Sequence, residues 1–166
     1  TDYLTGLANR SKLTEIFCRE RAHAQRNQSP LALVYLDIDH FKQINDRFGH
    51  EAGDQALRHF ASVLSQRLRT TDLLCRLGGE EFAALLPNTD AEQAAAIAEA
   101  LRERLASTPM MVDGAPVQMT LSAGVATFGQ DGERLDELMN AADKRTYAAK
   151  RAGRNQVVSA EASVPA

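Results

Sequence analysis

Residues 31–39 read LALVYLDID, and this stretch decides the fold. Its side chains are apolar or aromatic up to the first aspartate, a pattern typical of a strand buried on both faces of a sheet. The break Gln28-Ser29-Pro30 separates this run from the helical pattern before it. We therefore expect a central strand that ends in Asp37 and Asp39, with both carboxylates on one face because side chains alternate along a strand.

The segments around this strand predict helices and short strands. Amphipathic spacing predicts helices at residues 9–26, 52–68, 90–106 and 134–152, with Asp90 as an N-cap. Apolar runs at 73–77 and 82–86 flank Gly78-Gly79-Glu80-Glu81, which predicts a hairpin with an acidic tip. Further strands are expected at 110–112, 116–128 and 157–158. This irregular order favours an α/β (α+β) fold, in which helices flank a central, mostly antiparallel sheet.

Length and composition indicate one globular domain. The chain has 166 residues, of which 44% are hydrophobic and 25% are charged. We place the domain at residues 1–160 and expect residues 161–166 to be a disordered tail. The net charge of −3 argues against a surface for a nucleic-acid polymer or for an anionic membrane.

Cysteine usage and hydropathy indicate a cytosolic domain. Cys18 and Cys75 lie in apolar patterns, so we expect buried thiols in a reducing compartment. No apolar run is long enough to span a bilayer, which predicts no membrane contact by the domain itself. The chain begins at Thr1 with motif-like residues. We therefore expect an upstream sensory or dimerisation region, either soluble or membrane-anchored, outside this sequence.

Two acidic groups are candidates for a metal site. A carboxylate on an apolar strand is costly to bury unless it is paired or binds a metal. For Asp37 a metal role is at least as good as a helix-capping role, whereas for Asp39 we favour a helix cap or a solvent-exposed position. Glu80 and Glu81 alone are better explained as solvated acids of a tight turn. If the strand end and the hairpin tip are neighbours, a Mg²⁺ site for phosphoryl transfer becomes the better interpretation.

The polar segment at residues 41–54 offers groups for a nucleotide. Lys42 could meet a phosphate as a point charge. Asn45 and Asp54 could read a base edge together, since a carboxylate accepts from the adjacent N–H donors of guanine. From spacing alone, the alternative that Asn45 and Asp54 cap the next helix is favoured.

Two pairs of charged residues have both a functional and a local interpretation. Lys150 and Arg154 are spaced i, i+4 near the end of a helical pattern, where cations are expected on electrostatic grounds alone. Arg69 and Asp72 could form a local ion pair or could present a fork and an acceptor to a ligand.

Together these residues resemble the GGDEF-domain family of bacterial diguanylate cyclases, over roughly residues 2–158. The start DYLTGLANR at 2–10, the segment LDIDHFKQINDRFGHEAGD at 36–54 and the segment RLGGEEF at 76–82 are similar to the family's motifs, the last in its Glu-for-Asp form. LSAGVA at 121–126, Ala142-Asp143-Lys144 and residues 147–155 resemble its final blocks. The order of these motifs leaves little room for coincidence.

The resemblance implies a palm-like fold related to class III nucleotide cyclases and polymerase palms. It implies condensation of two GTP into cyclic di-GMP with release of two pyrophosphates, by a homodimer that uses Mg²⁺, with Mn²⁺ as an alternative. Asp37, the Ile38 carbonyl and Glu80 would hold the metal, and Glu80 would also be the base. Glu81 would assist the metal ions.

The remaining roles implied by the resemblance concern the nucleotides. Lys42 would contact phosphate and stabilise the transition state, and Arg69 and Asp72 would form the RxxD site through which the product inhibits. The other substrate contacts would come from Asn45, His50, Asp54, Gly79, Lys150 and Arg154.

A different class of function stays open. The chain could be a catalytically silent module that binds GTP or cyclic di-GMP and regulates an attached domain. A purely structural dimerisation domain would not explain the acidic hairpin tip.

Overall fold

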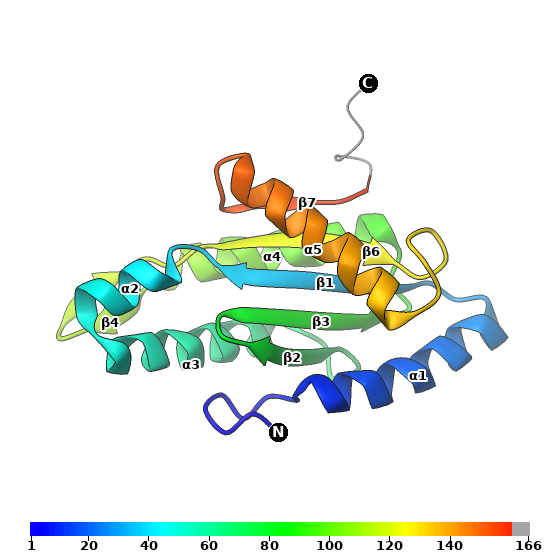
Figure 1. Ribbon diagram of the computed structural model, residues 1–166, viewed down its shortest axis with the longest axis horizontal. Helices are drawn as coiled ribbons and strands as arrows, with labels where there is room; N and C mark the ends of the chain where they lie inside the picture. The colour runs from blue at the N-terminus through cyan, green and yellow to red at the C-terminus, as the bar shows by residue number, and fades with distance from the viewer. Residues whose placement is uncertain (161–166) are drawn as a thin grey trace.

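A five-stranded sheet forms the centre of the computed structural model, which describes residues 1–160 (Figure 1). Its strand order is β2 (Leu73–Gly78), β3 (Glu81–Pro87), β1 (Leu31–Ile38), β6 (Leu121–Thr127) and β7 (Gln156–Val158). Neighbouring strands are antiparallel except for the parallel pair β6–β7. The expected central, mostly antiparallel sheet is confirmed, and 157–158 lies in its edge strand β7.

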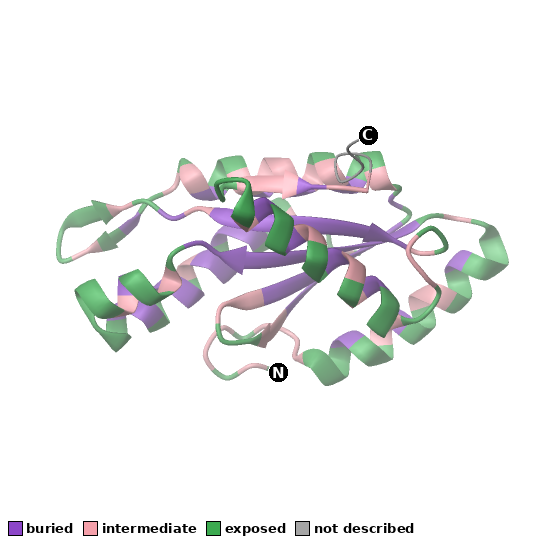
Figure 2. Ribbon diagram, turned by 45° about the horizontal axis from the view of Figure 1, so that its top comes forward, coloured by how far each residue is buried: buried purple, intermediate pink, exposed green. Residues whose placement is uncertain are grey.

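Helices cover both faces of this sheet. α1 (Arg10–Asn27) and α5 (Leu135–Arg151) pack on the face formed by Leu31, Leu33 and Tyr35 of β1. α2 (Phe41–Phe48), α3 (His50–Arg67) and α4 (Ala91–Ala106) pack on the opposite face. β1 is buried along its whole length, as Figure 2 shows by its continuous purple colour. Each large apolar side chain so buried stabilises the fold by ~1.5–3 kcal/mol.

The segment predicted as one strand at 116–128 is two strands. β4 (Met110–Val112) and β5 (Ala115–Val117) form a separate hairpin, closed by Asp113 and Gly114, which both have positive φ. The chain then leaves this hairpin and enters the main sheet as β6 at Leu121. The apolar pattern alone did not show this break, because the connecting residues include the buried Met119.

Two other expectations have different outcomes. Cys75 is buried as expected, but the prediction for Cys18 was wrong, because Leu13 and Phe17 take the buried positions of α1 and Cys18 faces solvent. The expected tail at 161–166 lies outside the described residues. Within residues 1–160, no helix has both the length and the apolar content needed to cross a membrane.

The close approach of α5 to the sheet depends on Gly124 of β6. A Cβ atom at this position would lie 2.1 Å from the Ala142 carbonyl oxygen and 2.5 Å from the Thr146 amide nitrogen. Thr146 also donates its hydroxyl to the Tyr35 carbonyl oxygen at 3.1 Å, which ties the helix to β1. The backbone of α5 therefore lies directly on the strands, and this sets how far its side chains reach along the sheet.

We predict that Gly124→Ala destabilises the protein by at least ~1–3 kcal/mol, because the added methyl must displace helix backbone rather than a flexible side chain. Urea unfolding followed by circular dichroism measures this change. Ala22→Ser, on the exposed side of α1, adds one atom where nothing opposes it and should change the free energy of unfolding by less than ~0.5 kcal/mol. Equal stability of Gly124→Ala and the parent protein would contradict the packing argument.

Candidate functional site

The end of β1 and the tip of the β2–β3 hairpin lie side by side. Asp37 pairs with Glu81 in the register of the antiparallel strands, and the Ile38 amide donates to the Glu80 carbonyl oxygen at 3.2 Å. The fold therefore gathers the carboxylates of Asp37, Glu80 and Glu81 at one edge of the sheet. This is the neighbour relation that would favour a metal site over solvated turn acids.

Asp37 is the most unusual group at this edge. Its carboxylate is buried, with Oδ2 accepting from Lys150 Nζ at 2.7 Å, while Oδ1 is also buried and receives no hydrogen bond from residues 1–160. Burial raises the pKa of the Asp37 carboxyl to about 6, the Lys150 ammonium opposes that shift, and the charges of Glu80 and Glu81 add to it. A buried acceptor without a donor is costly, so this oxygen is well suited to a cation.

A shared magnesium ion fits these residues better than a closed protein cage. Among residues 1–160 there is no group of three or more His, Cys, Asp or Glu side chains able to hold a metal. The expected donors are the Asp37 and Glu80 carboxylates and the Ile38 carbonyl, and the structure places Ile38 beside Glu80 through the hydrogen bond between the Ile38 amide and the Glu80 carbonyl oxygen. Mg²⁺ commonly takes one or two carboxylates and completes its shell with waters and substrate phosphates.

Arg76 fixes the hairpin tip. Its Nε and Nη2 donate to the Gly79 carbonyl oxygen at 3.1 and 2.8 Å, and its Nη1 donates to Asp2 Oδ1 at 3.1 Å. Asp2 also accepts from the Thr5 amide and hydroxyl. The N-terminal turn and the acidic tip are therefore one hydrogen-bonded unit. Residue spacing did not reveal this role, since Arg76 and Asp2 are far apart in the sequence.

Asn45 on α2 lies against Gly53 of α3, the residue before Asp54. A Cβ atom at position 53 would lie 1.8 Å from Asn45 Oδ1. Only glycine at this position therefore leaves room for the Asn45 side-chain amide. Neither Asn45 nor Asp54 caps a helix, because α2 and α3 have no side-chain cap. The capping interpretation favoured from spacing was wrong. Both side chains are unengaged among the described residues and Asp54 is exposed, as are Lys42 and His50.

The two cations near the C-terminal end have separate environments. Lys150 lies in the last turn of α5 and pairs with Asp37. Arg154 lies beyond the helix, which ends at Arg151, so the helical i, i+4 relation does not hold. The Arg154 side chain is exposed and makes no hydrogen bond or ion pair within residues 1–160.

Asp39 is neither a helix cap nor exposed, and both expectations for it were wrong. It is 4% exposed and accepts hydrogen bonds from the Thr120 and Ser122 hydroxyls and from the Asn155 amide. Its hydrogen-bond donors lie on β6, immediately before β6 and after α5, more than 80 positions away. Neighbouring residues in the sequence therefore carry no signal for it.

Arg69 and Asp72 form a local ion pair at the opposite end of β2. Arg69 Nη2 lies 2.7 Å from Asp72 Oδ1 and also donates to the Pro87 carbonyl and the Thr89 hydroxyl. Asp72 is almost fully covered, whereas the Arg69 side chain is 48% exposed. The pair is thus a rigid structure away from the acidic edge.

Comparisons with known proteins find relatives over nearly the whole chain. The model of the family "Diguanylate cyclase, GGDEF domain" matches residues 1–156. Diguanylate cyclase DgcP of Pseudomonas aeruginosa is 45% identical over 157 residues, which cover 95% of this chain and 23% of DgcP. The chain spans less than half the length of the curated relatives it matches, between 23% and 45%.

Solved structures are similar over nearly the whole chain. The GGDEF domain of DgcB from Caulobacter crescentus, in complex with c-di-GMP, is 37% identical with a TM-score of 0.89, covering 97% of this chain and 93% of that one. The active GGEEF domain of a diguanylate cyclase from Vibrio cholerae is 36% identical with a TM-score of 0.84, covering 92% and 97%.

We predict that Asp37→Asn stabilises the metal-free fold at high pH. The pKa of Asp37 is about 6 in the folded protein and 3.8 for an unperturbed aspartate, so the cost of ionising it develops as the pH rises between these values. In EDTA, the variant should gain ~3 kcal/mol over the parent by about pH 8 and almost nothing near pH 4. Urea unfolding across that range measures the difference.

Asp136→Asn is the control, because the pKa shift of Asp136 has the opposite direction to that of Asp37. A hydrogen bond from Arg134 lowers the pKa of the exposed Asp136, so that variant should not gain stability as the pH rises. A pH-independent gain for Asp37→Asn, or a loss that grows with pH, would contradict the assignment of a strained carboxylate at position 37.

Proposed function

The chain belongs to the GGDEF family of diguanylate cyclases, and from this premise we propose that it condenses two GTP into cyclic di-GMP and releases two pyrophosphates. The observation that carries the proposal is the buried Asp37 carboxylate, whose Oδ1 lacks a donor beside the glutamates of the hairpin tip. The Vibrio cholerae domain described as active has a GGEEF signature, as residues 78–82 do here. The proposal includes a cytosolic location, where the domain meets GTP.

Magnesium would be held by the Asp37 and Glu80 carboxylates and the Ile38 carbonyl, with Mn²⁺ as an alternative and Glu81 assisting. When bound, the metal would neutralise phosphate charge and lower the pKa of the attacking hydroxyl. The strain in the metal-free carboxylate supports this assignment, because a cation would relieve both the missing donor and the repulsion from the neighbouring glutamates.

The nucleotide would lie between the α2–α3 corner and the acidic edge. The free Asn45 amide and Asp54 carboxylate would read guanine, and His50 would shape the pocket. Gly79, with φ of 51°, leaves the tip without a side chain where the phosphates would approach. Lys42, Lys150 and Arg154 would contact the phosphates, which balances the acidic edge with three cations.

The reaction would proceed by attack of a ribose 3′ oxygen on the α-phosphate of the other GTP. Glu80 would accept the 3′ proton, the new P–O bond would form, and pyrophosphate would leave as its bond to the α-phosphorus breaks. Lys42 would stabilise the charge of the transition state. Each domain would bind one GTP, so the working unit is a homodimer with two facing sites.

Product inhibition would act through Arg69 and Asp72. This pair lies away from the acidic edge and is already rigid, and its exposed guanidinium leaves donors for a phosphate or a guanine. The complex of the DgcB domain with c-di-GMP supports a product-binding capacity in the family. A silent binding module is the competing function, and turnover separates the two.

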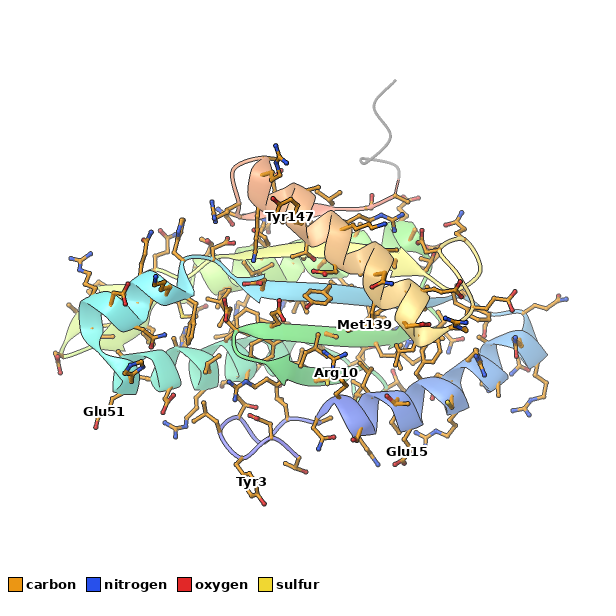
Figure 3. The ribbon with its side chains drawn as sticks, viewed as in Figure 1. Tyr3, Arg10, Glu15, Glu51, Met139 and Tyr147 are labelled. Atoms are coloured by element: carbon orange, nitrogen blue, oxygen red, sulfur yellow. The ribbon has the colours of Figure 1, made fainter. Side chains whose placement is uncertain are left out.

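The first test incubates the domain with GTP and Mg²⁺ over a range of protein concentrations and measures cyclic di-GMP by chromatography. The rate per molecule should rise with concentration as dimers form. Glu80→Gln should lower the rate by at least ~10²-fold while GTP still binds, since a general base contributes about that much. Glu15→Gln, which lies on the outer side of α1 (Figure 3), is the matched control and should keep full activity. Binding without turnover at every concentration would favour the silent module.

A second test addresses feedback. Arg69→Ala should raise the cyclic di-GMP concentration needed for half inhibition by about tenfold or more, because a charge-assisted contact is lost. Initial rates without added product should stay close to those of the parent. Arg67→Ala removes the same charge from the exposed end of α3 and should leave inhibition unchanged. Full inhibition of the Arg69 variant would exclude the site.

A further inference from the structure

The buried carboxylate of Asp39 accepts three hydrogen bonds. Oδ1 accepts from the Ser122 hydroxyl at 2.6 Å, and Oδ2 accepts from the Thr120 hydroxyl at 2.7 Å and from the Asn155 amide at 2.9 Å. Two of these donors belong to β6 or the residue before it, so the carboxylate is fixed to the sheet. The third donor belongs to the connection between α5 and β7.

This connection has an uncommon backbone. Gly153, Arg154 and Asn155 have successive φ values of 120°, 64° and 51°, and non-glycine residues rarely adopt positive φ, least of all in pairs. Hydrogen bonds over-determine the conformation. The Arg154 amide donates to the Ala149 carbonyl, the Arg154 carbonyl accepts from Gln156 Nε2, and the next amide donates to Asp39.

The backbone of Arg154 is therefore fixed, whereas its cationic side chain is exposed to solvent. Both peptide groups of Arg154 are engaged, whereas its guanidinium is exposed and has no partner within residues 1–160. A charged side chain gains most from binding an anion when its backbone is already ordered, because less conformational entropy is lost. Asp39 links this connection to the main sheet at the end of β1, while Arg102 Nη1 on α4 separately donates to the Asn155 side chain at 2.9 Å.

We propose that Asp39 is a positioning residue, which holds the Arg154–Asn155 backbone so that Arg154 is ordered for the phosphates of a bound nucleotide. The inference rests on the proposed function, because it takes the anion to be the triphosphate. The inference extends the proposed function, because it gives a role in nucleotide recognition to Asp39, a carboxylate that touches neither metal nor substrate.

The competing explanation is that Asp39 only stabilises the fold. Asp131 offers a matched comparison, because it is another shielded aspartate that accepts from the Thr127 amide and from Arg145. It lies past the end of β6 that is remote from the acidic edge. Asp131→Ala should therefore lower stability and leave nucleotide affinity unchanged.

The test measures the affinities of metal-supplemented protein for GTP and for GMP by calorimetry in a double-mutant cycle. Asp39→Ala and Arg154→Ala should each weaken GTP binding by about tenfold and GMP binding by less than about twofold. In the Arg154→Ala background, Asp39→Ala should cost nothing more, because it acts through that side chain. Asp39→Asn keeps an oxygen for the Asn155 amide and should restore GTP affinity to within about threefold of the parent.

Amide hydrogen exchange gives a readout that does not depend on nucleotide. The Asn155 amide should exchange faster in Asp39→Ala and at the parent rate in Arg154→Ala and Asp131→Ala. If Asp39→Ala does not fold, Thr120→Val carries the test, since it removes a donor from the same oxygen. Its GTP affinity should fall by about threefold, again only when Arg154 is present.

The outcomes separate the two proposals. The positioning role is overturned if Arg154→Ala weakens GTP binding but Asp39→Ala does not. Additive losses, equal losses for GTP and GMP, or an unchanged Asn155 exchange rate overturn it too. If the parent protein does not bind GTP, the proposed function fails and the positioning role falls with it.

Discussion

A negative charge buried at the end of β1 is the constraint on which the rest of the structure depends. β1 is covered on both faces, so its last residues inherit an apolar environment, and the Asp37 carboxylate is left with one donor for two oxygens. Gly124 lets α5 lie directly on the sheet, and the last turn of this helix brings Lys150 to Asp37. The glutamates of the hairpin tip reach it because β3 pairs with β1 in that register. The packing of the hydrophobic core thus determines which charged groups lie beside Asp37.

Local patterns in the sequence were enough for most of the fold. The apolar run at 31–39, the apolar runs on either side of Gly78-Gly79 and the helical spacing elsewhere predicted the central strand, the hairpin and four helices to within about two residues. The N-cap at Asp90 was also correct, since its side chain accepts from the Gln93 amide. These features succeed because each depends on residues that are close along the chain.

Contacts between distant segments explain what the sequence did not predict. Asp39 was predicted as a helix cap because its hydrogen-bond donors, such as Ser122 and Asn155, are far from it in the sequence. The role of Arg76 was not predicted, because its partner Asp2 is distant in the sequence and is brought close only by the fold. Asn45 and Asp54 were judged as caps, since nothing local indicated that Gly53 would bring α2 onto α3. Even Cys18 was misjudged because periodicity identifies a helical face without saying which residue lies at its margin.

The ion pair between Asp37 and Lys150 also has a thermodynamic consequence. Lys150 is the only cation that the described residues place on Asp37, and in the proposed reaction the same ammonium serves a phosphate. A metal ion that bound Asp37 would release Lys150, and a phosphate that bound Lys150 would make Asp37 available to the metal. The two ligands would then be linked, each raising the affinity of the domain for the other by the same factor. Lys150 is the counter-ion of Asp37, and its displacement in the proposed reaction would make metal and nucleotide bind cooperatively.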